Sequence, residues 1–494
     1  MNPMDLVRKE PYRLYIDGAS VPSASGETFD IINPVTNEPF AKAYKGGIED
    51  VERAIKAARE AFDNGPWGRM SAKERSQILL KAGSILERRA DEFAVLETLE
   101  CGKLYGSARY YECPMSVDAF QYFAGKARCL EGKVVPCDDG CLNFVEWCPV
   151  GVVAEILPWN GPFMMGCQKI NAILAAGDTC IVKPSSWASL SMLLMAEVYE
   201  EAGLPKGVFN VVTGSGAVIG DALTKSPLVD MVAMTGGTAT GKHIIAASAD
   251  TVKDVALELG GKSPNVIFDD VDMDEAVRWA RAAFTLNAGQ VCVSGTRLIL
   301  QRTIYEEFLQ KLKVLCESFV PGDGFDPNTT LSTLISKEHC AEVWKYIEKG
   351  KAEGARVICG GEPYTDPKLA KGNFVPCTVF ADVKPEMTCF QEEIFGPVLT
   401  VTPFDTEEEA VALANATKYG LAGGVFSKDI KRALRVARRI HGGQIYVNNY
   451  FSKLMIESPG TGWKESGIGV AGIQKYMISK TVFVDMVDGS NPPV

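Results

Sequence analysis

Three residues whose side chains could together react with a carbonyl carbon lie in separate motifs of this chain. Cys292 ends the motif NAGQVC, Glu258 begins the motif ELGGK, and Asn160 ends the motif PWN. A thiol can act as a nucleophile, a carboxylate as a general base, and a side-chain amide as a donor to an oxyanion. Each motif alone is a weak signal, because buried cysteines, solvated glutamates and asparagines in turns are common. In combination they indicate chemistry at a carbonyl carbon.

The order of these motifs resembles the aldehyde dehydrogenase family. The motif EIFGPV, which starts at Glu393, follows them, and the resemblance extends over residues 14–484. It implies an oxidoreductase that converts an aldehyde to a carboxylic acid with NAD or NADP, through a thiohemiacetal and then a thioester on Cys292. Asn160 and the backbone N–H of Cys292 are then expected to stabilise the oxyanion, and Glu258 to activate the water that hydrolyses the thioester.

Two other functions stay open for a chain with these motifs. A coenzyme A-acylating aldehyde dehydrogenase would pass the acyl group to a thiol, but such family members generally lack a carboxylate where Glu258 stands. A structural protein of the same fold would not need Cys292, Glu258 and Asn160 together. The resemblance also gives Lys169 a role in relaying protons; the usual acidic partner near the C-terminus corresponds here to Ile478, which cannot serve.

Composition narrows the range of partners. The net charge of −11 argues against nucleic acid or an anionic membrane, because both select a basic protein surface. The longest apolar stretches are far shorter than a membrane span. Fourteen cysteines in a chain that begins without an apolar signal segment indicate reduced thiols and a cytoplasmic protein. With three histidines and no Cys-x-x-Cys pair, we expect no metal site, and a Cys–His hydrolase is disfavoured without being excluded.

The elements that must position these residues follow from the hydrophobic pattern. Helical spacing is found over residues 50–62 and 72–100, and Ser71 with Glu74 forms a capping-box pattern before the second helix. From residue 150 onward, short runs of continuous apolar residues alternate with helical segments, which is typical of parallel sheets covered on both faces. The expected strands are 151–157, 179–183, 207–212, 231–234, 265–268, 296–301 and 442–449; the expected helices are 165–176, 189–202, 273–288 and 304–319.

These patterns predict an α/β protein with two doubly wound, Rossmann-like domains of parallel strands. A chain of 494 residues is too long for one core. We expect a coenzyme-binding domain from residues 1–130 and 151–260, and a catalytic domain that carries the nucleophilic cysteine from residues 261–450. The resemblance adds a small β element for oligomerisation, formed by a hairpin at 131–150 and a strand (residues 481–486) within 476–494, and it implies a homodimer or homotetramer.

Coenzyme binding is expected where two glycine-rich turns follow strands. One lies at residues 214–220 and nearly fits a dinucleotide fingerprint; the other, at 235–241, could hold a pyrophosphate at a helix start. The alternative interpretation is that each glycine-rich segment is only a turn before a helix. For Phe395, the alternative is an ordinary aromatic residue of the core. The residues expected to bind coenzyme are Ile156, Pro158, Trp159, Lys183, Ser185, Ser186, Gly216, Thr235, Gly236, Gly237, Leu259, Gly260, Glu393 and Phe395.

Ser186 bears on the choice between NAD and NADP. Family members that prefer NAD usually carry a glutamate at this position, which binds the ribose hydroxyls and repels a 2′-phosphate. Serine does not repel a phosphate, and Lys183 could pair with it. We therefore expect that NADP is accepted.

Three positions predict the shape of the aldehyde pocket. Gly161, Gln168 and Gly460 align with positions that are aromatic in many relatives acting on small apolar aldehydes. We expect a wider and more polar pocket, and a substrate bulkier or more polar than acetaldehyde, unless neighbouring loops refill the space. The full set of expected pocket residues is Met115, Gly161, Met164, Met165, Gln168, Val291, Val293, Lys453, Glu457 and Gly460.

Overall fold

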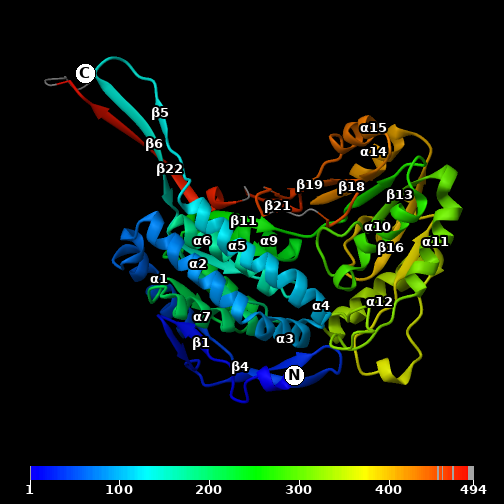
Figure 1. Ribbon diagram of the computed structural model, residues 1–494, viewed down its shortest axis with the longest axis horizontal. Helices are drawn as coiled ribbons and strands as arrows, with labels where there is room; N and C mark the ends of the chain where they lie inside the picture. The colour runs from blue at the N-terminus through cyan, green and yellow to red at the C-terminus, as the bar shows by residue number, and fades with distance from the viewer. Residues whose placement is uncertain (1, 453–455, 459, 470–471, 488–494) are drawn as a thin grey trace.

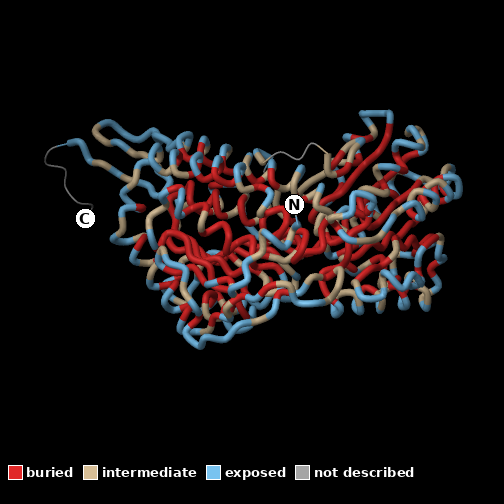
Figure 2. The backbone as a smooth tube through the Cα atoms, turned by 60° about the horizontal axis from the view of Figure 1, so that its bottom comes forward, coloured by how far each residue is buried: buried red, intermediate tan, exposed pale blue. Residues whose placement is uncertain are grey.

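The computed structural model describes residues 2–452, 456–458, 460–469 and 472–487. Two large sheets with helices on their faces form two bodies, and an arm of three strands projects from one of them (Figure 1). Buried residues are concentrated inside the two bodies, whereas exposed residues dominate the arm (Figure 2). The predicted α/β class with two doubly wound sheets and a small β element is confirmed. None of the described helices is long and apolar enough to span a membrane.

The first sheet has eight strands, of which the five central ones are parallel as predicted. Its edges are antiparallel, which the sequence analysis did not predict. In spatial order the strands are β2 (Ala19–Val21), β1 (Leu14–Ile16), β9 (Phe209–Val211), β8 (Thr179–Lys183), β7 (Val152–Ile156), β10 (Met231–Thr235), β11 (Asp254–Glu258) and β21 (Gly467–Ile468).

The helices expected at residues 50–62, 165–176 and 189–202 are found around this sheet, whereas the helices at residues 105–107, 113–127 and 221–225 were not predicted. Ser71 accepts a hydrogen bond from the Glu74 N–H and completes the capping box. The expected helix 72–100 is two helices, because the backbone of Arg89 leaves the helical conformation between them. The helices are α1 (Ile48–Asp63), α2 (Ala72–Arg88), α3 (Ala90–Cys101), α4 (Tyr105–Ser107), α5 (Cys113–Ala127), α6 (Pro162–Ala176), α7 (Leu190–Ala202), α8 (Asp221–Lys225) and α9 (Thr238–Ser248).

The second sheet has seven strands, all parallel except the edge strand β14. In spatial order they are β14 (Arg356–Cys359), β15 (Thr378–Ala381), β16 (Val398–Phe404), β13 (Arg297–Gln301), β12 (Pro264–Ile267), β18 (Ala422–Phe426) and β19 (Gln444–Val447). Its helices are α10 (Met273–Thr285), α11 (Tyr305–Glu317), α12 (Lys337–Ala352), α13 (Thr388–Gln391), α14 (Glu407–Asn415) and α15 (Ile430–Ala437).

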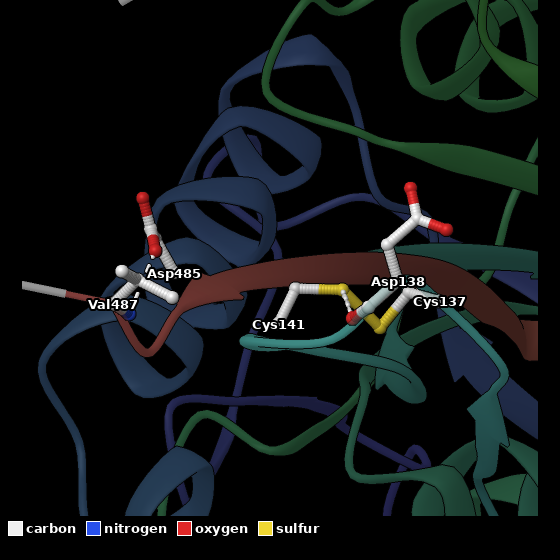
Figure 3. Close-up of a disulfide and its surroundings, with 5 residues drawn as sticks. All are labelled: Cys137, Asp138, Cys141, Asp485 and Val487. Carbon is white, nitrogen blue, oxygen red and sulfur yellow. Dashed lines mark hydrogen bonds between the residues drawn. A yellow bond between two sulfur atoms is a disulfide. The ribbon is translucent and has the colours of Figure 1, made fainter. Parts of the chain in front are cut away.

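The arm consists of β5 (Lys133–Val135), β6 (Cys141–Pro149) and β22 (Met477–Asp485), which pair antiparallel. The predicted pairing of the hairpin with the C-terminal strand is therefore found, although that strand starts earlier than residue 481. A disulfide joins Cys137 to Cys141 between β5 and β6, near Asp485 and Val487 (Figure 3). The expectation that the thiols are reduced is wrong for this pair.

Short elements complete the fold. Two further pairs of strands are β3 (Thr28–Asn33) with β4 (Glu38–Tyr44), and β17 (Tyr419–Gly420) with β20 (Trp463–Lys464). The single-turn helices are η1 (Pro3–Leu6), η2 (Trp67–Arg69), η3 (Ala108–Glu112), η4 (Gly216–Gly220), η5 (Ala249–Thr251), η6 (Leu286–Gly289), η7 (Arg302–Ile304), η8 (Pro367–Leu369) and η9 (Ile473–Tyr476).

Candidate active site

A cavity of about 760 Å³ is lined by residues from both sheets. Glu258 enters it from the end of β11, and Cys292 enters it from the loop between α10 and β13. Asn160, from the loop after β7, and Lys169, from α6, line the same cavity. The four residues that were expected to be catalytic are thus gathered around one space.

The loop before Cys292 has an unusual backbone. Asn287 and Ala288 adopt left-handed conformations with φ of 50° and 52°, and Gly289 follows with φ of 75°. Helix α10 therefore ends at Thr285, before the end predicted at residue 288, because such angles cannot continue a right-handed helix. The change of direction carries the chain to the cavity.

Gln290 fixes this loop through its side chain. Its Oε1 accepts a hydrogen bond from the Ile335 N–H at 2.9 Å, and its Nε2 donates to the carbonyl oxygens of Asn287 and Thr333 at 3.0 and 3.1 Å. Gln290 is completely buried, so these bonds satisfy a side chain that has no access to water. The position of Cys292, two residues later, is therefore well defined.

Asn160 joins the first sheet to this loop. Its Nδ2 donates to the carbonyl oxygen of Gln290 at 2.9 Å, and its own carbonyl oxygen accepts from Asn287 Nδ2 at 3.2 Å. Its side-chain amide has two N–H groups, and only one is needed for the bond to Gln290. The second N–H can therefore donate to an oxyanion beside Cys292.

The electrostatic environment of Cys292 disfavours the free thiolate. Burial, followed by the negative charges of Glu393 and Glu258, raises the pKa of Cys292 to about 12. The thiol must therefore give its proton to a base when it attacks, and Glu258 is a carboxylate in the same cavity.

Lys169 has an acidic partner that the sequence analysis did not identify. Its Nζ lies 3.4 Å from Oε1 of Glu155, which is completely buried in β7. Ile478 lies instead on the arm, where it pairs with Cys148 and is half exposed. The conclusion that residue 478 cannot serve Lys169 is correct, but the lysine is not without a partner.

Most of the expected pocket residues line the cavity: Met115, Gly161, Met164, Met165, Gln168, Val291, Val293 and Gly460. Glu457 is exposed and is not among the described residues that line it, and Lys453 lies outside the described residues. Aromatic rings from other segments also line the cavity, namely Tyr111, Phe123, Trp279, Phe319, Tyr450, Phe451 and Tyr476. The expectation of a wide pocket agrees with its volume, but the pocket is not poor in rings.

A second hollow of about 240 Å³ is formed by the expected coenzyme-binding residues Trp159, Lys183, Ser185, Ser186 and Gly216, with Trp187 in addition. Ser186 Oγ donates to the carbonyl oxygen of Gly214 at 2.7 Å. Burial lowers the pKa of Lys183 to about 8, and no carboxylate of the described residues lies within ion-pair distance of its Nζ. An anionic group placed here would supply that stabilisation.

The second glycine turn has room for a ligand. Gly236 and Gly237 separate β10 from α9, and a Cβ atom on Gly237 would meet no atom within 4 Å. The hydroxyl groups of Thr235 and Thr238 are buried without a hydrogen-bond partner among the described residues. Open space, orphan hydroxyls and the start of an eleven-residue helix fit a bound pyrophosphate.

Glu393 contacts the glycines that follow Glu258, and Phe395 contacts Trp159 of the second hollow. Glu393 accepts a hydrogen bond from the Gly261 N–H at 3.0 Å, and burial raises its pKa to about 7. A Cβ atom on Gly260 would lie 2.2 Å from Glu393 Oε2, so this close approach requires glycine. Phe395 is half-buried and meets Trp159 edge-on, with ring centroids 5.3 Å apart.

The remaining expected coenzyme residues support these hollows. Ile156 and Pro158 are half-buried at the end of β7. Leu259 is buried, and a Cβ atom on Gly241 of α9 would lie 2.6 Å from its side chain. Leu259 therefore sets how closely α9 approaches the end of β11.

Comparison with known proteins agrees with this site. The family model described as "Aldehyde dehydrogenase family" matches residues 21–484. The chain belongs to the aldehyde dehydrogenase family. The chain is 40% identical over 481 residues, 96% of each sequence, to DhaS of Bacillus subtilis (strain 168), whose name provisionally places it in this family. Aldehyde dehydrogenases oxidise aldehydes to acids with a nicotinamide coenzyme, and this chain is such an enzyme.

Two solved structures show how closely the fold is shared. The NAD-dependent aldehyde dehydrogenase of Sinorhizobium meliloti is 39% identical, with a TM-score of 0.96 over 100% of this chain and 97% of that chain. The betaine aldehyde dehydrogenase of Staphylococcus aureus, solved with NAD+, is 38% identical, with a TM-score of 0.97 over 100% and 98% of the two chains. The aldehyde dehydrogenase fold therefore extends over the whole chain.

Sequence analysis missed two charged residues of this site. Glu155 stands in an expected strand of buried apolar residues, and a carboxylate in such a strand is a signal that it has a buried partner. Lys475 lies 3.6 Å from Glu258, and nothing in its local sequence distinguishes it from a surface lysine. Its burial follows only from the return of the chain after β21.

Proposed function

We propose that Cys292 is the nucleophile of an aldehyde dehydrogenase that releases a free carboxylic acid. The observation that carries this proposal is the convergence of Asn160, Glu258 and Cys292 on one cavity. Cys292 Sγ attacks the aldehyde carbon and its proton passes to water in the cavity, and the oxyanion that forms accepts hydrogen bonds from Asn160 and from the backbone N–H of Cys292. When bound, the nicotinamide coenzyme supplies the hydride acceptor, and a thioester remains on Cys292.

Glu258 then serves as the base for hydrolysis of the thioester. Its carboxylate takes a proton from water as the water attacks the thioester carbon, and it returns that proton to the sulfur as the intermediate collapses, so that the free acid and the Cys292 thiol are released. Asn160 again donates to the oxyanion of this second step. The presence of Glu258 favours hydrolysis over transfer of the acyl group to coenzyme A.

The proposed coenzyme site extends from the Lys183–Ser186 hollow to Glu393. Lys183, Ser185 and Ser186 would hold the adenosine ribose, the Gly236–Gly237 turn the pyrophosphate, and Glu393 the nicotinamide ribose beside Phe395. In these terms residues 1–130 and 151–260 form the coenzyme domain, and 261–450 form the catalytic domain. Ser186 and the poorly compensated cation of Lys183 support the use of NADP as well as NAD.

The proposed substrate is an aldehyde larger or more polar than acetaldehyde. A cavity of about 760 Å³ is much larger than a two-carbon molecule, and it has both aromatic and polar lining residues. The betaine aldehyde dehydrogenase of Staphylococcus aureus has a name that refers to a bulky, charged aldehyde, and similarity to it agrees with this proposal.

The arm supports a proposed homodimer or homotetramer. It exposes large apolar side chains that a monomer would leave in water: Val134, Trp147, Ile478, Phe483 and Met486. The segments involved, 131–150 and 476–494, are those expected to mediate oligomerisation. Twelve of the fourteen cysteines are free, which favours the cytoplasm as the location.

A single assay distinguishes the proposed reaction from its alternatives. The enzyme is mixed with a panel of aldehydes and with NAD or NADP, with and without coenzyme A, while absorbance is followed at 340 nm. We expect reduction of the coenzyme and formation of the free acid without coenzyme A. A strict requirement for coenzyme A would indicate the acylating enzyme, and no reduction with any aldehyde would indicate a structural protein.

A further inference from the structure

Two buried ion pairs lie behind the candidate base. Lys475 Nζ is 3.6 Å from Glu258 Oε1, and Lys169 Nζ is 3.4 Å from Glu155 Oε1. Glu155 and Lys169 come from the consecutive elements β7 and α6, whereas Glu258 of β11 and Lys475 of η9 come from distant parts of the sequence. We call Glu155, Lys169, Glu258 and Lys475 the charge cluster.

The charge cluster is far from bulk water. The exposed fractions of the side chains are 0% for Glu155, 7% for Lys475 and 14% for Lys169, whereas Glu258 is 22% exposed toward the cavity. Both carboxylate oxygens of Glu155 and the Nζ of Lys169 lack a hydrogen-bond partner among the described residues. An unpaired charge with so little access to water raises the free energy of the folded protein. The two ammonium groups and the two carboxylates must therefore compensate one another's charge.

The pKa shifts show that the two pairs interact. Burial, and then the positive charge of Lys169, lowers the pKa of Lys475 to about 8, while Glu258 and Glu155 act to raise it. Burial raises the pKa of Glu155, and Lys169 and Lys475 oppose that shift. Glu155 therefore helps to keep Lys475 cationic beside Glu258.

We propose that Lys475 is a positioning residue for thioester hydrolysis: its ammonium group holds the Glu258 carboxylate oriented toward Cys292. This inference rests on the proposed role of Glu258 as the base. At 3.6 Å the two groups form an ion pair longer than a hydrogen bond, so the carboxylate keeps lone pairs that can accept a proton from water. A neutral residue at position 475 would remove this ion pair and leave the orientation of the Glu258 carboxylate unconstrained by a cation.

The experiment measures hydrolysis without coenzyme or aldehyde. Cys292 of the full-length enzyme attacks the carbonyl of 4-nitrophenyl acetate, 4-nitrophenolate leaves, and an acetyl thioester forms; water then releases acetate and restores the thiol. Release of nitrophenolate reports acylation, and rapid-quench mass spectrometry of the acetyl-enzyme reports hydrolysis. The variants are Lys475→Met, Lys475→Arg, Glu258→Gln, the double variant Lys475→Met with Glu155→Gln, and the control Lys242→Met, which removes an exposed lysine paired with Glu465.

We expect Lys475→Met to be acylated at the parental rate. It should hydrolyse the acetyl-enzyme roughly 10-fold more slowly or worse, because a general base contributes about 10²–10⁴-fold to the rate and the variant loses part of that contribution. The pH–rate profile for hydrolysis should also differ from that of the parent, because the cation beside the proposed base is lost. Besides the charge cluster, the titratable groups in this environment are Cys292 and the buried Tyr476 and Cys180. Lys475→Arg keeps the charge and should recover part of the rate, and Lys242→Met should match the parent.

Several results would overturn the inference. An unchanged hydrolysis rate and pH profile in Lys475→Met would do so, as would an equal loss of acylation and hydrolysis, which indicates a purely structural role. Full recovery in the double variant would show that only charge balance with Glu155 matters. The proposed base itself is tested separately, because Glu258→Gln with the parental hydrolysis rate would refute the role of Glu258 whatever Lys475→Met does.

Discussion

Asn160 and Gln290 are joined by a hydrogen bond of 2.9 Å between a side-chain amide of one body and a main-chain carbonyl of the other. This bond sets the distance between the proposed oxyanion donor and the loop that ends at Cys292. The side chain of Gln290 is itself held by three hydrogen bonds, so the donor is aimed by a rigid partner. Preorganised donors of this kind need no rearrangement when charge develops.

Replacement of Asn160 by alanine should lower turnover by roughly 10²–10³-fold, the range found for the loss of one oxyanion donor. Coenzyme binding, measured by fluorescence titration, should barely change, because the amide points to the cavity and not to the Lys183–Ser186 hollow. Asn160→Asp is a matched control that keeps the size of the side chain but removes its donors, and it should be equally impaired. Near-normal turnover in either variant would show that Asn160 is a turn residue and not an oxyanion donor.

Ser186 should determine the choice of coenzyme together with Lys183. We expect NADP to be used at least comparably with NAD, measured as kcat/KM for each. Ser186→Glu should shift the preference toward NAD, because a carboxylate beside the 2′-phosphate repels it. A parent enzyme that reduces NAD alone would show that other residues set the choice.

The preference for NADP should also depend on pH. Burial lowers the pKa of Lys183 to about 8, so its cation is present below that pH and is lost as the pH rises through it. The ratio of kcat/KM for NADP to that for NAD should therefore fall between pH 7 and pH 9. Lys183→Met removes the titrating group and should make the ratio low and independent of pH. A ratio that rises with pH in the parent enzyme would contradict the pairing.

Adding a ring to the pocket should penalise large aldehydes more than acetaldehyde. Gly161 is the best site, since its Cβ atom would meet only the flexible end of Met165 at 3.1 Å, whereas a Cβ atom on Gly460 would lie 2.2 Å from Gln444 Nε2. For Gly161→Phe, kcat/KM across aldehydes of rising size should fall most for the largest, because added bulk clashes only where the substrate reaches it. Gly460→Phe, whose side chain must displace Gln444, should also lower kcat/KM most for the largest aldehydes.

In the parent enzyme acetaldehyde should have a high KM, since burial of so small a molecule gains only about 25 cal/mol per Å² of apolar surface. If acetaldehyde were the best parental substrate, the proposal of a wide pocket would be wrong. An equal loss for all aldehydes in Gly161→Phe would contradict it as well.

Local pattern was sufficient to predict much of the fold. Continuous apolar strands gave four of the five parallel strands of the first sheet and β12, β13 and β19 of the second, and Ser71 with Glu74 gave the start of α2. The parallel strands β11, β15, β16 and β18 were not predicted. The break at Arg89 was missed, because the apolar spacing of the two helices continues across it. The antiparallel edge strand β21 was missed because two residues carry no periodic signal.

Within the site, residues in motifs were predicted and residues placed by tertiary contacts were not. Asn160, Glu258 and Cys292 each lie in a recognisable motif and line the same cavity. The pairing of Lys475 with Glu258 depends on how the chain returns after β21, which no local pattern determines. The aromatic lining of the pocket likewise comes from segments whose sequences resemble ordinary core.

The most direct test of the central claim is to trap the acyl-enzyme on Cys292. Glu258→Gln is mixed with NAD or NADP and the best aldehyde of the panel, and reduced coenzyme is followed at 340 nm while the protein is analysed by peptide mass spectrometry. We predict slow turnover, with a burst close to one reduced coenzyme per subunit if Cys292 is still acylated readily, and an acyl group on the peptide that contains Cys292, whereas Cys292→Ala should give neither. Substantial steady turnover in Cys292→Ala, or hydrolysis at the parental rate in Glu258→Gln, would contradict the account.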